Sequence, residues 1–499
     1  MGYCRSFYRT HLARYVLFRH LKRLGLAMWW PLRNMAFAMK TLARPRLFYR
    51  TYLAQYRVFH LLKTCLLSIY FRFPAVSARL FQLRRPARTF HLISMRDFVT
   101  KQAIGPIVVE SSKKIQISGP KFVGRYPIKI HYVETVSLDT PAIEVMEISD
   151  ATVVGGTNLI LSGAWAIHPD LLVPSRDVMP AETYGIATVA LDRGEIKVRL
   201  SRRRKTSARA ISLLGQCTGN YAHWLTETLP KLLFVDAIEE FDGLPLLVDG
   251  WIHPTFRTTI DLLSKKKRTI INVERWEAVL VSSVIEVSPP AYVPPEFRSY
   301  VGGVGIPVPS PRYFPFSLKA LEMLRSAAWG VAASASPTNG SRKLYILRPP
   351  ESVGNQRFIS NIEDVERLIL ANGFEPIDPA KLSIAEQIAV FRDARCIISP
   401  VGAALANTIF TPAGCKVIAL APYYENANYY YFSNLMGVLG HDLHYVLGPQ
   451  VEKGGHALHR DYAIDLVALA EALERLEEPT SRMIDGEGAV SLAGAGYEQ

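Results

Sequence analysis

The sequence predicts an α/β protein in which two doubly wound domains face each other. Short apolar runs alternate with amphipathic helical stretches twice along the chain, between about residues 210 and 287 and again between residues 343 and 421. This alternation favours right-handed crossover connections and mainly parallel sheets. With 499 residues and 49% hydrophobic content, the chain is long enough for two or three domains, each with its own core.

Changes in composition divide the chain into five segments. Short β-branched runs separated by Gly, Asn and Asp precede the first alternating unit, and a Pro-rich connector over residues 288–315 ends it. The predicted segments are a basic, amphipathic helical extension (1–96), a β-rich lead-in (97–201), a first Rossmann-like domain (202–315), a second Rossmann-like domain (316–478) and a disordered tail (479–499).

Charge is concentrated at the N-terminus. Residues 1–96 contain 19 of the 58 Lys and Arg residues and no Asp or Glu, while the whole chain has a net charge of +14. Basic amphipathic segments rich in aromatics are attracted to anionic membrane surfaces, so we expect a cytoplasmic protein held at the inner face of a membrane. A translated upstream stretch, a disordered tail, an Arg-rich targeting peptide and nucleic-acid binding remain as alternatives.

Two further patterns limit the class of protein. The apolar runs of the basic segment, such as Leu24–Leu32, are shorter than the roughly 18 residues that span a bilayer, and no cleavable signal follows them. The five cysteines are scattered without a C-x-x-C pair, which suits a reducing compartment and argues against a disulfide framework or a cysteine metal site.

The first informative motif is "NYAHWLTETLP", which runs from Asn220 to Pro230. Helical spacing places Asn220, His223 and Glu227 on one stripe, whereas Trp224 falls on an apolar stripe and is expected in the core. Pro230 should kink the helix. The polar stripe indicates acid or base chemistry, but a helix-capping Asn220 and a structural His223 are the alternatives.

The second motif is "CIISPVGAALANTIFTPAGCKVIALAP", from Cys396 to Pro422. A buried strand ends before Gly402, and Ala403 begins a helix whose free N–H groups favour an anion. Arg348 and Arg357 follow another strand and should lie at the same sheet edge, where guanidinium groups can pair with a diphosphate. Packing of small residues and solvated loop arginines are the alternatives for these positions.

The two motifs together, joined by "LYILRPPESVGNQRFISNIEDVERLILANGFEPIDPAKLSIAEQIAVFRDARCII", resemble glycosyltransferase family 61. The resemblance runs from about Asp150 to Leu447. It implies a GT-B fold in which the first domain binds the acceptor and the second binds a nucleotide sugar. It also implies transfer with inversion and a role in capsular polysaccharide or other cell-surface glycan biosynthesis.

Within this resemblance, each motif has an expected role. The sequence has no Asp-x-Asp, so we expect no metal or other cofactor, with Arg348, Arg357 and the Gly402–Ala403 turn neutralising the diphosphate. Inversion needs a base. Glu227 is slightly favoured over His223 as this base, with the other residue orienting it.

The chain departs from the family pattern at two positions. Val401 stands where many members have His, and Ala419 where they have Glu, while Asn407 of the same motif is retained and is expected to support the donor turn. A catalytically degenerate, membrane-associated scaffold is therefore the main alternative function. A basic nucleic-acid-binding protein is a further one.

Overall fold

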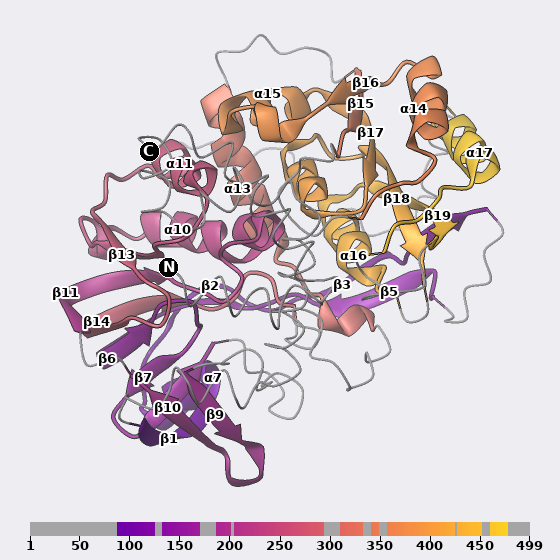
Figure 1. Ribbon diagram of the computed structural model, residues 1–499. Coiled ribbons are helices and arrows are strands. Elements are labelled where there is room, and N and C mark those ends of the chain that lie inside the picture. The colour runs from indigo at the N-terminus through magenta and orange to yellow at the C-terminus, as the bar shows by residue number, and fades with distance from the viewer. Residues whose placement is uncertain are drawn as a thin grey trace, which may run out of the picture. The chain divides into compact units, whose positions relative to one another are not determined.

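The computed structural model describes residues 87–124, 132–169, 186–200, 204–293, 310–332, 341–348, 357–424, 427–451 and 460–477. Most of the predicted basic extension and the predicted tail lie outside these residues. Residues 81–499 form one compact unit, and the description below concerns that unit alone (Figure 1).

The first sheet joins eleven strands of the described residues. Its order is β13 (Ile270–Val273), β12 (Leu246–Asp249), β11 (Arg204–Leu213), β14 (Ala278–Val287), β6 (Ile143–Val154), β7 (Ile160–Ser162), β8 (Trp165–His168), β1 (Ala87–Ser94), β10 (Glu195–Arg199) and β9 (Ala187–Ala190), with β2 (Ile107–Glu110) also paired to β6. Strands β11 to β14 are mutually parallel, whereas β6 pairs antiparallel with β14.

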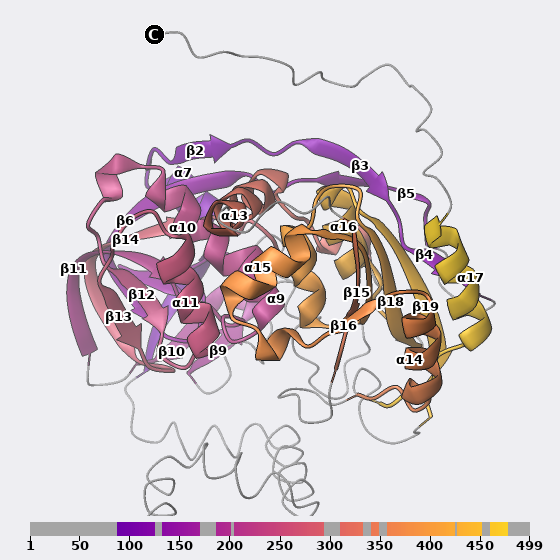
Figure 2. The same cartoon turned by 90° about the horizontal axis from the view of Figure 1, so that it is seen from above.

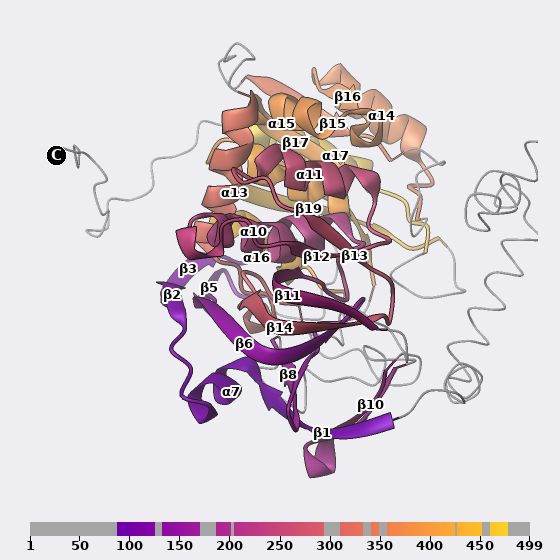
Figure 3. The same ribbon diagram turned by 90° about the vertical axis from the view of Figure 1, so that its left-hand side faces the viewer.

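The parallel part of this sheet has the doubly wound order 3-2-1-4. Because β12 and β13 lie on one side of β11 and β14 lies on the other, the sheet has a topological switch point between β11 and β14. We call the part of the unit built on this sheet the first half, and the part built on the other large sheet the second half. The helices of the first half are α9 (Tyr221–His223), the π-helical segment η5 (Trp224–Thr228), α10 (Leu229–Asp236), α11 (Pro254–Leu263) and α13 (Leu318–Val331). Figure 3 shows α10 and α11 above β11 and β14.

The second sheet is parallel throughout. Its order is β16 (Glu375–Ile377), β15 (Arg342–Ile346), β17 (Ala394–Pro400), β18 (Lys416–Tyr423), β19 (Asp442–Pro449) and β4 (Lys121–Val123). The first five strands follow the doubly wound order 2-1-3-4-5, which puts the switch point between β15 and β17.

Helices connect or follow the strands of this second half of the unit. They are α14 (Ile362–Ala371), α15 (Ile384–Arg392), the 3₁₀ helix η10 (Ala403–Phe410), α16 (Tyr430–Leu439) and α17 (Leu466–Glu477). Ser383 and Glu386 form a capping box that starts α15, which explains why its first residue could be read from sequence.

The lead-in strands are shared between the two sheets. Strand β2 pairs with β6 in the first sheet, and β4 pairs with β19 in the second. Between them β3 (Lys114–Ser118) and β5 (Thr135–Asp139) pair antiparallel as a two-stranded ribbon, and β3 contacts α16. Figure 2 shows this ribbon passing along both halves. The lead-in therefore completes both sheets.

Residues 87–96 differ from the predicted helical extension. Strand β1 covers Ala87–Ser94 and is inserted between β8 and β10, and helix α7 (Met95–Lys101) follows it directly. The alternation of Arg with apolar residues resembles a helical pattern locally, but pairing with two distant strands decides the structure of this stretch.

One hydrophobic core runs through the helical layer between the sheets. It contains Trp224 and Phe234 from the first half and Phe391 and Phe410 from the second. Helix α13 contacts α10 and α11 as well as α15 and η10. The helices that follow β11 and β17 are consequently packed into the same core.

Candidate active site

The helix that follows β11 starts at the switch point of the first sheet. After Leu213 the chain turns through Gly215 and Thr218, and Asn220 caps the helix by accepting a hydrogen bond from the N–H of Ala222 over 3.0 Å. The switch point of a doubly wound sheet is where ligands bind, because helices leave the adjacent strands in opposite directions there. The first motif therefore stands at a ligand-binding position of the fold.

His223 and Glu227 are the two partly exposed residues in the otherwise buried run from Ala222 to Asp236. Trp224, in contrast, is fully buried and donates its indole N–H to Thr259 Oγ1 over 2.9 Å, which confirms its predicted place in the core. Burial of all the other side chains fixes the rotation of the helix, so His223 and Glu227 face outward together.

The backbone between these two residues is π-helical. The N–H of Leu229 bonds to the carbonyl of Trp224, five residues earlier. Pro230 has no N–H for the Thr226 carbonyl, and the π turn lies immediately before it. The kink predicted at Pro230 thus takes the form of one wide turn.

The imidazole and the carboxylate are in direct contact. His223 Nδ1 lies 2.6 Å from Glu227 Oε1, and the two side chains are 15% and 13% exposed. Because the carboxylate accepts from Nδ1–H, this pairing favours the tautomer in which Nε2 has the lone pair. The pair has the geometry of a base and its orienting group.

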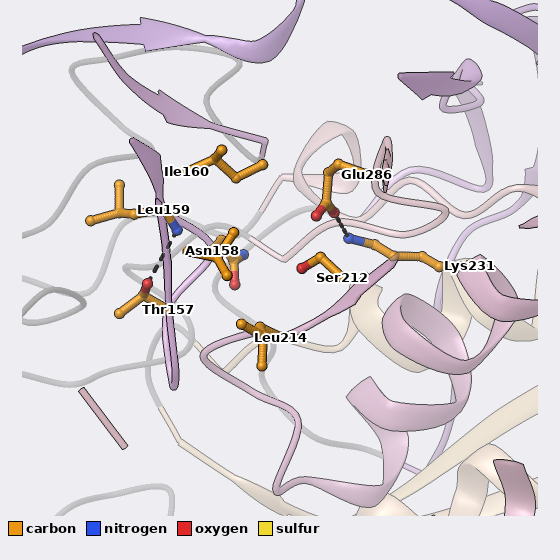
Figure 4. Close-up of a pocket in the computed structure, with 9 residues that line it drawn as sticks. Thr157, Asn158, Leu159, Ile160, Ser212, Leu214, Lys231 and Glu286 are labelled. Atoms are coloured by element: carbon orange, nitrogen blue, oxygen red, sulfur yellow. Dashed lines mark hydrogen bonds and ion pairs between the residues drawn. The ribbon is translucent and has the colours of Figure 1, made fainter. Parts of the chain in front are cut away.

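A small polar pocket lies beside Glu227, between the ends of β11 and β14. It is lined by Asn158, Gln216, Thr218, Glu227 and Lys231, among others. A second pocket adjoins it, and Figure 4 shows Lys231 reaching Glu286 there, beside Ser212 and Asn158. Each pocket has room for about one or two water molecules.

Lys231 and Glu286 form a buried ion pair below the catalytic candidates. Lys231 Nζ is 2.6 Å from Glu286 Oε1, and the side chains are only 11% and 4% exposed. Removing one partner of such a pair costs about 3–5 kcal/mol because an unpaired charge stays buried. The pair joins α10 to β14 at the switch point, and sequence reasoning missed it although Lys231 stands four residues after Glu227.

A buried carboxyl group braces the same region. Asp249, at the end of β12, accepts hydrogen bonds from the N–H groups of Gly156 and Gly215 and from the Thr218 hydroxyl, at 2.8, 3.1 and 2.6 Å. Burial raises the pKa of Asp249 to about 6, against the lowering effect of these donors. An Asp-Gly pair directly after the apolar strand "LPLLV" was the sequence signal for this brace.

Gly156 must be glycine for this contact. Its φ is +75°, and a Cβ there would lie 3.0 Å from the ring of Trp251. The left-handed backbone turns the N–H of Gly156 toward Asp249 while leaving space for the indole.

The second motif lies at the switch point of the second sheet. Arg348 follows β15 and Gly402 follows β17, the two strands that flank this point. Arg348 Nη1 is 3.4 Å from the Val401 carbonyl, and Arg357 Nη2 donates to the same carbonyl. A Cβ on Gly402 would lie 3.2 Å from Arg348 Nη2. The structure therefore brings Arg348, Arg357 and Gly402 together.

The two guanidinium groups concentrate positive charge in a partly dry place. Burial, and next to it the charge of Arg357, lower the pKa of Arg348 to about 10. Among the residues that the structure describes, no carboxylate forms an ion pair with Arg348. A buried cation without a carboxylate partner is stabilised when an anion binds.

The helix that begins at Ala403 reinforces this charge. Its first N–H groups point toward the turn, and its last carbonyls are capped by side chains: Arg325 donates to Ile409 O, and Trp329 to Phe410 O. A cation at the C-terminal end and open N–H groups at the N-terminal end are the arrangement that favours an anion at Ala403.

Asn220 and Asn407 both make hydrogen bonds within the protein. Asn220 caps α9. Asn407 is fully buried and bonds to Tyr221 and Gln387 rather than lining the Gly402 turn. Of the tyrosines after β18, Tyr431 lies near His223, with 6.1 Å between ring centroids, whereas Tyr429 and Tyr430 pack against Tyr132.

Comparison with known protein families matches this part of the chain. Residues 221–418 fit the family model described as Glycosyltransferase 61. This match over residues 221–418 supports membership in glycosyltransferase family 61. The matched residues begin at α9 and end in β18, so they include His223, Glu227, Arg348, Arg357 and Gly402.

The family match is narrower than the resemblance first indicated. It begins 71 residues after Asp150 and ends before Ala419, so most lead-in strands lie outside it. No curated protein matches the chain. The match indicates glycosyltransferase activity in general.

Two surveys of the described residues complete the site. No group of three or more His, Cys, Asp or Glu side chains is arranged there to hold a metal ion. None of the helices in the described part of the chain is long and apolar enough to span a bilayer.

Proposed function

We propose that the chain is an inverting, metal-independent glycosyltransferase of the GT-B type. It would transfer a sugar from a nucleotide-sugar donor to a polysaccharide or glycolipid of the cell surface. The observation that carries the donor assignment is the grouping of Arg348, Arg357 and Gly402 at the switch point between β15 and β17.

In this proposal the donor diphosphate lies against the Gly402 turn. Arg348 and Arg357 neutralise the charge that develops on the leaving diphosphate as the bond to the anomeric carbon breaks, and the N–H groups at Ala403 add to this. A diphosphate would also relieve the electrostatic cost of the neighbouring guanidinium groups.

We assign the proton transfer to the His223–Glu227 pair. His223 Nε2 accepts the proton of the acceptor hydroxyl while the acceptor oxygen attacks the anomeric carbon from the face opposite the diphosphate. Glu227 holds Nδ1–H and stabilises the imidazolium that forms, as the 2.6 Å contact supports. This reverses the sequence-based order of preference, in which Glu227 was the base.

The proposal also assigns a role to the N-terminal segment. Residues 1–96, most of them outside the described residues, would bring the protein to an anionic membrane through their 19 basic side chains. The acceptor would then be presented at that surface.

The decisive experiment is a donor screen followed by a transfer assay. Nucleotide sugars are first ranked by how far they raise the melting temperature, since a ligand that binds only the folded state stabilises it. The best donor is then incubated with a panel of glycan and glycolipid acceptors in the presence of EDTA. Release of nucleoside diphosphate is expected, with inverted configuration of the product by NMR.

Other results would change the assignment. Product that forms only when divalent metal is restored would remove the metal-independent mechanism. Donor binding with no turnover on any acceptor would favour a non-catalytic scaffold, the alternative function that Val401 and Ala419 suggest.

A further inference from the structure

The helix with His223 and the turn with Gly402 are joined by a buried polar contact. The hydroxyl of Tyr221, two residues before His223, donates to Asn407 Oδ1 over 2.6 Å. Asn407 lies in η10, five residues after Gly402, and is fully buried. One hydrogen bond therefore connects the element with the candidate base to the element with the candidate donor site.

The direction of this hydrogen bond is fixed by its neighbours. Gln387 Nε2 donates to the carbonyls of Pro379 and Leu382, so its Oε1 must face Asn407. Asn407 Nδ2 donates to that oxygen over 3.1 Å, which leaves Asn407 Oδ1 as an acceptor for the Tyr221 hydroxyl. Each member of the chain from α15 through η10 to α9 can thus adopt only one orientation.

The surroundings make the contact strong. Gln387 and Asn407 are 5% and 0% exposed, and burial raises the pKa of the Tyr221 hydroxyl, which keeps it protonated as a donor. In such surroundings a hydrogen-bond network resists distortion, because a displaced group would lose its partner without gaining water. The directional bond therefore restricts the position of α9 relative to η10 more than nonpolar packing alone would.

We propose that Tyr221 and Asn407 are positioning residues that hold the His223–Glu227 pair in register with the donor turn. The proposal rests on the function proposed above. Neither residue touches the reacting atoms. Their effect is on the distance between base and anomeric carbon, and a misplacement of about 1 Å in such a geometry can cost about 100-fold in rate.

The test uses Tyr221→Phe, which removes only the hydroxyl. The matched control is Tyr445→Phe, because Tyr445 is buried and likewise donates its hydroxyl within the protein, to the carbonyl of Tyr429 over 2.8 Å in the second half. We expect Tyr221→Phe to lower kcat about 10- to 100-fold with the donor KM changed less than about twofold. Tyr445→Phe should leave both unchanged.

A double-mutant cycle separates positioning from general destabilisation. Asn407→Ala removes the acceptor of the same bond, so the variant with both substitutions should lose no more kcat than the worse single variant. Losses that multiply, or a kcat of Tyr221→Phe equal to that of Tyr445→Phe, would overturn the proposal.

A readout without turnover distinguishes this proposal from the proposed function. Hydrogen exchange is measured with the nucleoside diphosphate that most raises the melting temperature. Bound nucleotide should protect amides of both η10 and α9 in the wild type, and of η10 alone in Tyr221→Phe. Equal protection of α9 in both proteins overturns the positioning role while leaving the donor site intact. If no nucleoside diphosphate binds, the proposed function fails first and the positioning role with it.

Discussion

His223 Nδ1 and Glu227 Oε1 lie 2.6 Å apart across the single π turn of their helix. Residues four apart on a regular helix are also neighbours, but burial of nearly every other side chain of this helix leaves the pair no alternative direction. The contact uses the nitrogen that a general base does not need. In the proposed mechanism, the remaining nitrogen, Nε2, accepts the proton of the acceptor hydroxyl.

The first prediction concerns which member of the pair takes the proton. His223→Ala should lower kcat by about 1,000-fold, within the range that loss of a general base gives. Added imidazole should raise the kcat of His223→Ala at least about tenfold, because it supplies the missing base in the space that the side chain vacates. Steady-state kinetics with and without imidazole measure the effect.

Glu227→Ala is the comparison for that experiment. If Glu227 were the base, formate or azide would rescue Glu227→Ala while imidazole would fail to rescue His223→Ala. That pattern would return the proton transfer to the carboxylate.

The second prediction is that replacing Arg348 stabilises the free protein but weakens donor binding. Its folded-state pKa is about 10, below the ordinary value for arginine, so the unfolded chain holds the proton more tightly and the charge destabilises the fold at every pH below about 10. Arg348→Met should therefore raise the melting temperature of the free protein while raising the donor KM about 10- to 100-fold.

The control for Arg348 stands on β15, the strand that precedes it. Arg342 begins β15 at the opposite end and pairs with Glu375 at 2.5 Å. Arg342→Met should leave the donor KM unchanged. An unchanged donor KM in Arg348→Met as well would remove the diphosphate from this edge of the sheet.

The third prediction concerns Gly402. Its backbone is extended, with φ of 171°, so alanine is tolerated there, but the new Cβ would lie 3.2 Å from Arg348 Nη2. Gly402→Ala should change the free energy of unfolding by less than about 0.5 kcal/mol. By shifting the guanidinium it should weaken binding of the nucleoside diphosphate about tenfold, measured by calorimetry.

Gly330→Ala provides the control for this substitution. Gly330 lies in α13 with nothing within 4 Å of a built Cβ. Alanine there should stabilise the helix by about 0.5–1 kcal/mol and leave nucleotide affinity unchanged. If both variants bind nucleotide as the wild type does, Gly402 is not at the donor site.

The fourth prediction is a pH dependence from Asp249. Its folded-state pKa is raised to about 6, so between pH 4 and 6 the folded chain holds a proton that the unfolded chain has released. The contribution of this group to stability is lost as the pH rises through that window. Relative to Asp249→Asn, the wild type should lose up to about 3 kcal/mol of unfolding free energy between pH 4 and 6.

Denaturant unfolding at several pH values checks this difference. Asp261 is exposed on α11, so Asp261→Asn serves as the control and should show no such slope. A constant difference between the wild type and Asp249→Asn across the window would show that Asp249 is ionised throughout.

The second half was the more predictable part of the fold. Its central strands β17 and β18 are apolar and mostly buried, and α15 begins at a recognisable capping box, so local sequence contains much of the information. The same rules located Gly402 and Arg348, because the carboxyl ends of adjacent parallel strands meet at one edge.

The fold of the first half was harder to predict, because it depends on pairing between strands that are far apart in the sequence. The antiparallel contact between β6 and β14 and the insertion of β1 between β8 and β10 are set by long-range register. The role of Asn407 was hidden for a related reason. Its partner Tyr221 lies 186 residues away, and only the folded chain shows that the two amides and the hydroxyl form one network.

The pairing of β4 with β19 has a practical consequence for dividing the protein. Strand β19 is the last strand contributed by the second half, and β4, 321 residues earlier at the Lys121–Asp442 contact, covers its outer edge. A shortened chain that begins near residue 316 would lack β4 and leave the edge of β19 at His444–Val446 without its partner strand. Such edges recruit other chains. Expressing the second half alone, from about residue 316, should therefore yield aggregates rather than an isolated nucleotide-binding half.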